Sequence, residues 1–440
     1  MSDVAATLES RLDALETMLG PPSRFVIAFS GGLDSTVLLH AVVTAGRDVP
    51  LLAVHVDHQL QAASAEWADT ACRTARAWGV DCRIETVVPD RAMGKGPEGA
   101  ARVARYAALS ALLEPGDWLL SAHHADDQVE TLFLNLLRGS GPDGLAAMPA
   151  SRALGAGWLV RPFLALTRET LAGYARSFEL DWIDDPSNAE CTFDRNFLRR
   201  EVLPRLAERW PDSVQRLSRS VERQQDAKRL LGEIGRLDLA ALGKPDRLDV
   251  QRLLELSTAR QRNVLRVAVQ RAGLPAAPGS VLDAIVADVL PARDDAEPLV
   301  AWPGGEARRY RGTLYLLAPL MPPPREPLEF AGEILSLPGD LGSLLLDAGD
   351  HEGLAPEVVA EGLAVRWREG GERLRAVADG PTRELKKLLQ EAAIVPWMRA
   401  RLPLLYAGDR LVAVADRFLA ADVTTRPGVR IRWHDHPAVD

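Results

Sequence analysis

The sequence predicts an α/β protein in which a doubly wound parallel sheet is followed by a helical domain and then by a small α+β domain. Apolar, strand-like runs alternate with helix-like runs up to residue 122. From residue 212 to residue 290 the pattern becomes helical and rich in arginine. A proline-rich stretch at 319–327 then precedes short strand-like runs and many glycines. Alternating strands and helices are typical of a parallel sheet covered by helices.

The elements of the predicted sheet follow one another at regular intervals. The first run, 25–29, is apolar throughout, as expected of a parallel strand that is buried on both faces. Ligands of doubly wound sheets bind beyond the carboxyl ends of the strands. Polar residues that could bind a ligand or take part in catalysis follow the first, second and fourth runs at this edge. The predicted strands are 25–29, 51–56, 82–88 and 118–122, and the predicted helices are 35–45, 61–78 and 98–113.

The chain of 440 residues is too long for one compact core, so we predict several domains. The proline-rich stretch 319–327 is predicted to be a stiff linker. One amphipathic helix is predicted near 382–393. The predicted boundaries are 1–212 for the doubly wound domain, 213–318 for the helical domain, 319–352 for a linker region and 353–440 for the α+β domain.

Composition excludes several classes of protein. No apolar run reaches the roughly 18 residues of a membrane span, and the N-terminus has neither the basic nor the apolar region of a secretory signal. We therefore expect a cytoplasmic protein without membrane contact. The three cysteines, Cys72, Cys82 and Cys191, form no C-x-x-C pair. Free thiols in a reducing compartment are the expectation for such a set.

The net charge of −9 is unevenly distributed. Residues 191–280 carry 18 Lys and Arg against 11 Asp and Glu, and residues 361–440 carry 14 against 11. Basic stretches in an acidic chain indicate either local RNA-binding faces or solvated helical surfaces. Charge alone leaves both interpretations open.

The most informative segment is Ser30-Gly-Gly-Leu-Asp-Ser35, which joins the first strand to a helix. Gly31 and Gly32 lack a Cβ, so the backbone can turn tightly and approach a ligand. A helix N-terminus here would present amide groups and a favourable dipole to phosphate. The alternative is a plain turn in which Asp34 or Ser35 caps the helix. No G-x-x-x-x-G-K-[ST] loop occurs, and the segment instead resembles the loop of enzymes that split ATP between the α- and β-phosphates.

A second cluster, Ser121-Ala-His-His-Ala-Asp-Asp127, occupies the end of the fourth strand and the start of a helix. Asp126 and Asp127 are favoured in a first helical turn by the helix dipole. The histidines and carboxylates also suit a transition metal. Carboxylates in a phosphate pocket hold Mg²⁺, and an imidazole can contact phosphate or relay a proton. We rank the magnesium and nucleotide interpretation first, capping second and zinc third.

Two arginine-bearing segments are ambiguous from sequence. Arg102 and Arg105 are three residues apart and share a helix face, either solvated or directed at phosphate or RNA. The turn residues 185–188 precede a basic helix that is either solvated or in contact with phosphate. The basic residues of that helix are Arg195, Arg199 and Arg200.

Together these segments resemble the tRNA(Ile)-lysidine synthetase family of N-type ATP pyrophosphatases, in the PP-loop superfamily. The resemblance covers nearly the whole chain and is thin between 225 and 355. The matching segments are Ser30-Gly-Gly-Leu-Asp-Ser, Val54-His-Val-Asp-His-Gln, Glu98-x-x-Ala-Arg-x-x-Arg-Tyr, Ala122-His-His-Ala-Asp-Asp-Gln-x-Glu-Thr, Leu137-Arg-Gly-Ser-Gly, Asp185-Pro-Ser-Asn, Arg195-Asn, Arg368-Glu-Gly-Gly-Glu and Leu385-Lys-Lys-Leu-Leu-Gln-Glu.

The resemblance implies an adenine nucleotide alpha hydrolase-like fold and a two-step ligation. The wobble cytidine of a tRNA(Ile) with a CAU anticodon would be adenylated by ATP, releasing diphosphate, and free L-lysine would then displace AMP. ATP and Mg²⁺ are the implied cofactors. The residues implied to bind ATP are Ser30, Gly31, Gly32, Leu33, Asp34 and Ser35, with Asp34 and Asp127 at Mg²⁺, and the implied catalytic residues are Asp34, Arg102, His123, Asp127 and Arg195.

The resemblance also implies that the C-terminal half binds tRNA, with no protein partner beyond a second copy of the chain. For Trp397 we prefer a place in the core to a stacking role. The sequence Arg373-Leu-Arg lacks the Arg-Pro of many relatives, so no direct role is assigned to Arg373 or Arg375. The residues implied to contact tRNA are Arg199, Arg200, Lys386, Lys387, Arg399 and Arg401.

Two other functions compete with lysine ligation. A tRNA thiolase shares the ATP step but generally uses paired cysteines. This sequence contains no C-x-x-C motif, which counts against thiolation. An RNA-binding protein without catalysis would not need Asp34, His123 and Asp127 together. Release of pyrophosphate from ATP distinguishes the catalytic interpretations from the last one.

Overall fold

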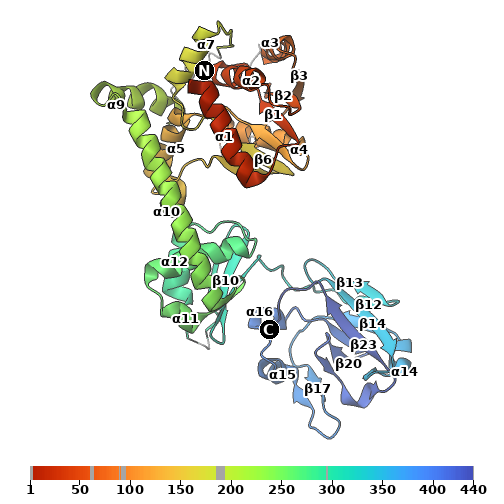
Figure 1. The fold of residues 1–440 in the computed structure, drawn as a ribbon. Coiled ribbons are helices and arrows are strands. Elements are labelled where there is room, and N and C mark those ends of the chain that lie inside the picture. The colour runs from red at the N-terminus through yellow and green to blue at the C-terminus, as the bar shows by residue number, and fades with distance from the viewer. Residues whose placement is uncertain are drawn as a thin grey trace. The chain divides into compact units, whose positions relative to one another are not determined.

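A computed structural model describes residues 3–59, 64–88, 90, 96–184, 194–293 and 296–439 of the chain (Figure 1). The chain divides into two compact units, Met1–Leu230 and Leu231–Asp440. Within the described ranges, no helix combines the length and apolar character needed to cross a membrane.

The first unit is built on a six-stranded sheet in the order β3-β2-β1-β4-β6-β5. All neighbours are parallel except the edge pair of β5 and β6. Because β1 lies between β2 and β4, the connections diverge there, which is where doubly wound sheets bind ligands. The strands are β1 (Arg24–Ala28), β2 (Leu51–Asp57), β3 (Asp81–Thr86), β4 (Asp117–Leu120), β5 (Ser151–Leu154) and β6 (Gly157–Val160).

Helices cover both faces of this sheet. Successive strand side chains point to opposite faces: Phe25 and Ile27 of β1 lie in one hydrophobic core, whereas Val26 lies in another. The larger core is closed by helices α1, α2, α3 and α7, and the smaller one by α4. The predicted α/β class and the predicted helices are confirmed. The helices are α1 (Asp3–Leu19), α2 (Leu33–Ala45), α3 (Ser64–Ala77), α4 (Gly96–Ala111), α5 (Ala125–Leu137) and α7 (Arg168–Ser177).

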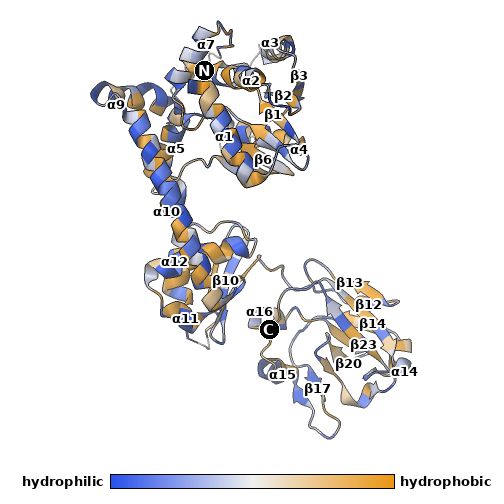
Figure 2. Ribbon diagram, viewed as in Figure 1, coloured by the Kyte–Doolittle hydropathy of each residue, from blue (hydrophilic) through white to orange (hydrophobic). Residues whose placement is uncertain are grey.

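The rest of the first unit is helical, and its last helix continues into the second unit. Figure 2 shows that hydrophilic residues predominate along α9 and α10. Near residue 225, α10 contacts the first unit, because Gln225 Nε2 donates to the carbonyls of Ala146 at 3.1 Å and Met148 at 3.0 Å. These elements are α6 (Pro142–Leu145), α8 (Asp194–Phe197), a π-helical turn (Leu198–Val202), α9 (Leu203–Arg209) and α10 (Ser213–Leu242).

The predicted helical domain 213–318 also contains an antiparallel sheet in the order β7-β8-β11-β10-β9. The β10–β11 hairpin turns at Arg311 and Gly312, whose φ angles are 45° and 75°. Asn-Gly or Asp-Gly is the usual signal for such a turn, so Arg-Gly hid it from the sequence analysis. The elements are β7 (Gly243–Lys244), β8 (Arg247–Asp249), α11 (Val250–Leu254), α12 (Thr258–Arg271), α13 (Gly279–Ala284), a π-helical turn (Ile285–Val289), β9 (Leu299–Trp302), β10 (Gly305–Tyr310) and β11 (Thr313–Leu317).

The C-terminal part holds two further five-stranded sheets, β12-β16-β19-β20-β21 and β13-β14-β23-β15-β22, and the pair β17-β18. Its first strands are β12 (Leu328–Phe330), β13 (Ile334–Ser336) and β14 (Ser343–Gly349). The others are β15 (Gly353–Leu354), β16 (Leu363–Arg366), β17 (Arg373–Leu374), β18 (Arg383–Glu384), β19 (Leu404–Ala407), β20 (Arg410–Val414), β21 (Phe418–Leu419), β22 (Thr424–Thr425) and β23 (Gly428–His434). Its helices are α14 (Pro356–Ala360), α15 (Leu385–Glu391), α16 (Pro396–Arg399) and a 3₁₀ turn (Ala421–Val423).

The prediction of a linker over 319–352 is therefore wrong beyond residue 327. Residues 318–327 contain no helix or strand, but β12 pairs with β16, and β14 pairs with β23 over its whole length. A strand whose partner lies far along the chain leaves only a short apolar run in the local sequence, and that run was not recognised as a strand.

The expectation of free thiols is also wrong for two of the three cysteines. Cys72 of α3 and Cys82 of β3 form a disulfide, with their Cα atoms 5.2 Å apart. The pairing arises because α3 packs back onto the strand that follows it, which spacing in the sequence did not reveal. Cys191 lies outside the described residues.

Candidate active site

The loop between β1 and α2 requires glycine at Gly31. Its φ of +79° lies in the left-handed region, which side chains with a Cβ disfavour. A Cβ at this position would also stand 2.7 Å from Ile183 Cδ1 and 3.2 Å from the Cβ of Ala71. The Gly31 carbonyl accepts a hydrogen bond of 2.9 Å from the Ile183 amide. A hollow of about 80 Å³ lies against this loop, lined in part by the same three residues.

The serines of the loop are hydrogen-bonded within it. The hydroxyls of Ser30 and Ser35 are 3.0 Å apart, and Ser35 Oγ donates to the Gly32 carbonyl at 3.0 Å. No side chain caps α2 at Gly32, so the plain capping alternative is not supported. The first-turn amides of α2 are thus available to an anion, as at other helix N-termini that bind phosphate.

His124 lies at the centre of the carboxylates that were predicted to cooperate. Its Nε2 is 3.6 Å from Asp34 Oδ2 and 3.5 Å from Asp127 Oδ2, and its Nδ1 is 3.3 Å from Asp126 Oδ2. Burial alone would lower the pKa of His124, but the neighbouring carboxylates, Asp127 foremost, raise it to about 10. His124 is therefore an imidazolium that bridges the ends of β1 and β4, and the sequence analysis assigned it no role.

The carboxylates differ in their capacity to hold a cation. Asp34 Oδ1 is buried and has no hydrogen-bond partner, which suits a hard cation with oxygen ligands. Both oxygens of Asp127 are occupied: Oδ2 accepts from the His124 amide at 3.0 Å, and Oδ1 contacts two arginines. No group of three or more His, Cys, Asp or Glu is placed to hold a metal in the described part of the chain. The donor set thus fits Mg²⁺ at Asp34 and gives Asp127 a different task.

Asp127 belongs to a buried network with Glu130, Arg195 and Arg199. Arg195 donates to Glu130 at 2.6 Å and to Asp127 at 2.8 Å, and Arg199 donates to the same pair at 2.6 and 3.2 Å. Burial acts to raise the pKa of Asp127. The opposing effects of His124, Arg195 and His123 are larger together, so the pKa lies well below its usual range. Glu130, which is 0 % exposed on its side chain, was missed, although its spacing of three residues from Asp127 puts both on one face of α5.

Arg199, which was predicted to contact tRNA, is half-buried in this network, and its contact with tRNA stays a prediction. It lies in a π-helical turn, a feature that is frequent at functional sites. Arg200 is exposed, as an RNA contact requires. The motif Asp185-Pro-Ser-Asn lies outside the described residues.

His123 follows β4 and is held by Ser121, whose Oγ is 2.7 Å from His123 Nδ1. Burial lowers the pKa of His123 to about 3, and the charges of Arg161, Arg102 and Arg195 act in the same direction. The imidazole is therefore neutral at pH 7 and can contact phosphate only as a hydrogen-bonding group. Arg102 is exposed on α4, with its guanidinium 5.3 Å from the ring centroid of Tyr106.

The predicted tRNA contacts of the second unit divide into two classes. Lys386 and Lys387 are exposed on α15. Arg399 is half-buried and donates to the Ile394 carbonyl at 2.9 Å and to the Tyr310 hydroxyl at 3.0 Å. Both ends of the Arg399 guanidinium are thus engaged within the protein.

Arg401 is only 2 % exposed and forms an ion pair with Asp340. The prediction that Arg401 contacts tRNA is therefore wrong, because RNA cannot reach a buried guanidinium. Trp397 packs against the C-terminal core, with its ring 5.1 Å from that of Tyr315. This confirms the preference for a place in the core.

His58, after β2, gives the first unit an acid-sensitive contact. Its Nε2 is 3.1 Å from Arg105 Nε, and burial together with the Arg105 charge lowers its pKa to about 4. Free histidine titrates near 6.5, so between those two values the unfolded chain binds a proton that the folded chain refuses. His58 therefore costs the folded state no stability above pH 6.5. As the pH falls from 6.5 toward 4, the folded state is progressively destabilised relative to the unfolded state.

We therefore expect His58→Gln to lose less unfolding free energy than wild type between pH 7 and pH 4.5. Glutamine retains an oxygen that can accept from Arg105 but does not titrate. Urea unfolding at the two pH values measures the difference, with the exposed His434→Gln as the control. Equal losses in wild type and His58→Gln would show that His58 is already free to protonate in the folded protein.

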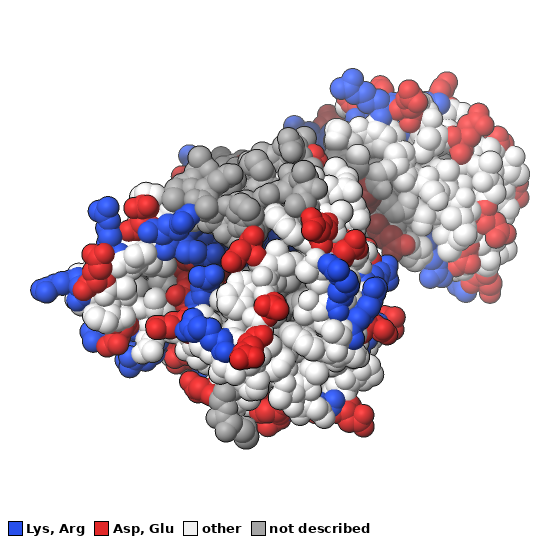
Figure 3. Space-filling model, turned by 90° about the horizontal axis from the view of Figure 1, so that it is seen from above, with Lys and Arg blue, Asp and Glu red and all other residues white. Residues whose placement is uncertain are grey.

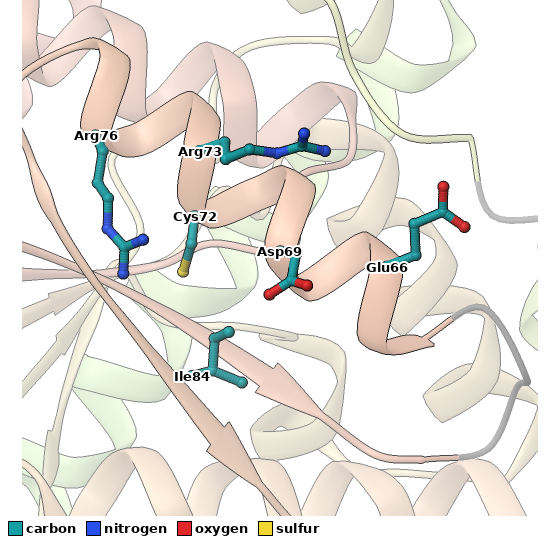
Figure 4. Close-up of a pocket in the computed structure, with 6 residues that line it drawn as sticks. All are labelled: Glu66, Asp69, Cys72, Arg73, Arg76 and Ile84. Atoms are coloured by element: carbon teal, nitrogen blue, oxygen red, sulfur yellow. The ribbon is translucent and has the colours of Figure 1, made fainter.

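Charges of both signs are interspersed on the surface around these elements. Figure 3 shows acidic and basic side chains side by side on the first unit. A separate open hollow of about 380 Å³ lies outside α3 and β3. Figure 4 shows Cys72 and Asp69 directed from α3 toward Ile84, and Arg73 directed away. This hollow holds none of the predicted site residues.

The arrangement agrees with what the chain resembles in comparison with known proteins. Residues 4–206 match the PP-loop domain, residues 248–315 the TilS substrate binding domain and residues 363–433 the TilS substrate C-terminal domain. A tRNA(Ile)-lysidine synthase of Alkalilimnicola ehrlichii is 45% identical over 425 residues, which cover 95% of each chain. The chain belongs to the tRNA(Ile)-lysidine synthase family.

Other relatives in the family match over similar lengths. The tRNA(Ile)-lysidine synthase of Pseudomonas aeruginosa is 41% identical over 98% of this chain and 97% of its own. That of Coxiella burnetii is 40% identical over 90% of each. Family membership confirms the resemblance that the motifs indicated, and it leaves the thiolase alternative without support.

Proposed function

We propose that the chain joins free L-lysine to C2 of the wobble cytidine in the CAU-anticodon tRNA(Ile), with cleavage of ATP to AMP and diphosphate. The product, lysidine, changes codon reading from AUG to AUA and amino-acid identity from methionine to isoleucine. The observation that carries the proposal is the meeting of Ser30–Ser35 with His123, His124 and Asp127 at neighbouring strand ends, in a chain that matches lysidine synthases over nearly its whole length.

In the first step, the cytosine O2 attacks the α-phosphorus of ATP and diphosphate leaves. The uncapped amides after Gly32 receive the departing phosphates, and the Ser35 hydroxyl joins them by exchanging its hydrogen bond to the Gly32 carbonyl for one to phosphate. His123, being neutral, stabilises charge at the α-phosphate through a hydrogen bond, and preorganised donors of this kind are most effective where charge develops. Asp34 is the residue that would hold Mg²⁺, which would neutralise phosphate charge and orient the phosphate oxygens.

In the second step, the ε-amine of lysine attacks C2 and AMP leaves. Adenylation is needed because a carbonyl oxygen is a poor leaving group and AMP is a good one. Arg195, fixed by Asp127 and Glu130, presents a positioned cation beside the reacting base or its phosphate. The buried ion pairs supply the rigidity that such placement requires.

The remaining domains are assigned to tRNA. We place catalysis in residues 1–212 and tRNA binding in residues 213–318 and in the C-terminal domain, which begins at β12. Lys386, Lys387 and Arg200 are the contacts favoured by their exposure. A cytoplasmic location follows from the substrates, since tRNA, ATP and free lysine occur together there.

The test measures both half-reactions with one purified protein. We expect diphosphate release with the CAU-anticodon tRNA(Ile), and incorporation of labelled lysine that requires both ATP and that tRNA. The matched controls are the same tRNA with uridine at the wobble position and the methionine tRNA with the same anticodon. Diphosphate release without lysine transfer would contradict the proposal by indicating a different nucleophile.

A further inference from the structure

Three arginines of the first unit gather around Tyr106 on α4. Arg102, one turn earlier on the same helix, and Arg152 of β5 each place Cζ 5.3 Å from the Tyr106 ring centroid. Arg161, which follows β6, is only 4 % exposed; its Nη1 donates to the Pro149 carbonyl at 2.8 Å, and its buried Nε has no hydrogen-bond partner. These residues are called the Tyr106 cluster below.

The Tyr106 cluster has no counter-ion in the described part of the chain. No carboxylate there lies within ion-pair distance of Arg102, Arg152 or Arg161, whereas the nearby Arg195 is paired with two. Arg161 donates to the Pro149 carbonyl but has no carboxylate partner in that part of the chain, and a guanidinium that is buried without a counter-ion is costly. Burial lowers the pKa of Arg161, Tyr106 acts to raise it, and the charges of Arg152 and Arg102 act to lower it. Three guanidinium groups gathered around one tyrosine, without a carboxylate among them, favour an external anion.

The sheet places this cluster beside the reaction centre rather than at the ATP loop. Arg152 pairs in register with Leu159 of β6, and the Arg161 amide donates to the Ala150 carbonyl at 2.8 Å. Both arginines therefore lie at the carboxyl end of β6, the edge from which His123 follows β4. In the order β1-β4-β6-β5, strand spacings of about 4.8 Å put the adjoining ends of β6 and β5 roughly 10–14 Å from the end of β1.

We propose that Arg102, Arg152 and Arg161 form a subsite for a backbone phosphate of the tRNA next to the cytidine that is modified. The ligand chemistry is a phosphate anion, and two sources exist, ATP and RNA. RNA is favoured because the diphosphate of ATP is directed to Ser30–Ser35, on the other side of β4. The inference rests on the proposed function, and it moves Arg102 from the α-phosphate of ATP to the RNA.

The test uses Arg152, because it is exposed and its replacement leaves the core intact. For Arg152→Gln we expect tRNA(Ile) binding to weaken about 3- to 10-fold at 0.1 M salt. The slope of log K against log salt should fall by about 0.7 to 0.9, the value of one lost phosphate contact. The ATP dissociation constant, measured without RNA, should stay within about twofold of wild type.

Two controls separate a phosphate contact from a general charge effect. Arg152→Lys retains the charge and should retain the salt slope. Arg73→Gln removes the same charge from an exposed position on α3 and should leave both slope and affinity unchanged. Lysine incorporation by wild type is measured in parallel, so a failure of the proposed function appears there and not in the salt slope.

Unchanged tRNA affinity and slope in Arg152→Gln would overturn the inference. Weaker ATP binding with an unchanged RNA slope would also overturn it, because the cluster would then serve the nucleotide. A wild type that binds tRNA but incorporates no lysine would refute the proposed function, while the slope comparison would still decide whether the cluster contacts RNA.

Discussion

Asp34→Ala is expected to release diphosphate from ATP ~1,000-fold more slowly than wild type, while binding tRNA(Ile) with unchanged affinity. Asp34 stands at the start of α2, with one oxygen 3.6 Å from His124 and the other buried without a partner. Removing it takes away the free oxygen assigned to Mg²⁺ and one of the carboxylates that hold His124. Both losses fall on charge stabilisation at the phosphates, so diphosphate release is the measurement.

A matched carboxylate variant keeps this prediction specific. Asp69→Ala removes an exposed aspartate from α3 and should leave diphosphate release unchanged. Because His124 loses a neighbour in Asp34→Ala, the unfolding midpoint is measured alongside. A folded Asp34→Ala variant that turns over within about tenfold of wild type would exclude a role for Asp34 at the phosphates.

Glu130→Gln is expected to destabilise the first unit by about 3–5 kcal/mol, the usual effect of removing one partner from a buried ion pair. Glu130 accepts from both Arg195 and Arg199 at 2.6 Å and is fully buried. Glutamine has nearly the same shape, so the loss reports the charge rather than the packing. Asp127 would remain as the carboxylate that pairs with both guanidinium groups.

The measurement for Glu130→Gln is urea unfolding of the full chain, with hydrogen exchange of the α5 amides to localise the effect. The double variant Glu130→Gln/Arg199→Gln removes one positive charge as well and should recover part of the lost stability, as expected for residues in one network. Additive losses in the double variant would show that the two side chains are not coupled. Lysine incorporation should fall in the single variant, since Arg195 is no longer held at two points.

The sequence analysis did not predict β5 and β6 of the first unit, whereas it predicted β1, β2 and β4, because these three strands are largely buried. Such strands appear as continuous apolar runs, as at residues 25–29, and their carboxyl ends predict where a ligand site lies. The antiparallel strands of the second unit are short and find their partners far along the chain. β14 and β23 are therefore visible as a pair only in three dimensions.

The sequence analysis predicted which residues form the site better than it predicted which side chains interact there. Asp34, His123 and Asp127 were placed at the correct strand ends, but His124 was not recognised as the cation between the carboxylates. Arg401 could not be distinguished from an exposed basic residue, because nothing in the local sequence indicates that it is buried in an ion pair with Asp340. Pairing between distant side chains decides which charges remain available to a ligand, and periodicity does not encode that pairing.

The bond between Cys72 and Cys82 determines where a reporter group can be attached. The chain has three cysteines, so the oxidised protein has at most one thiol for a maleimide dye. Reduction before labelling would place up to three dyes on the same chain. The molar ratio of dye to protein would then give the number of thiols.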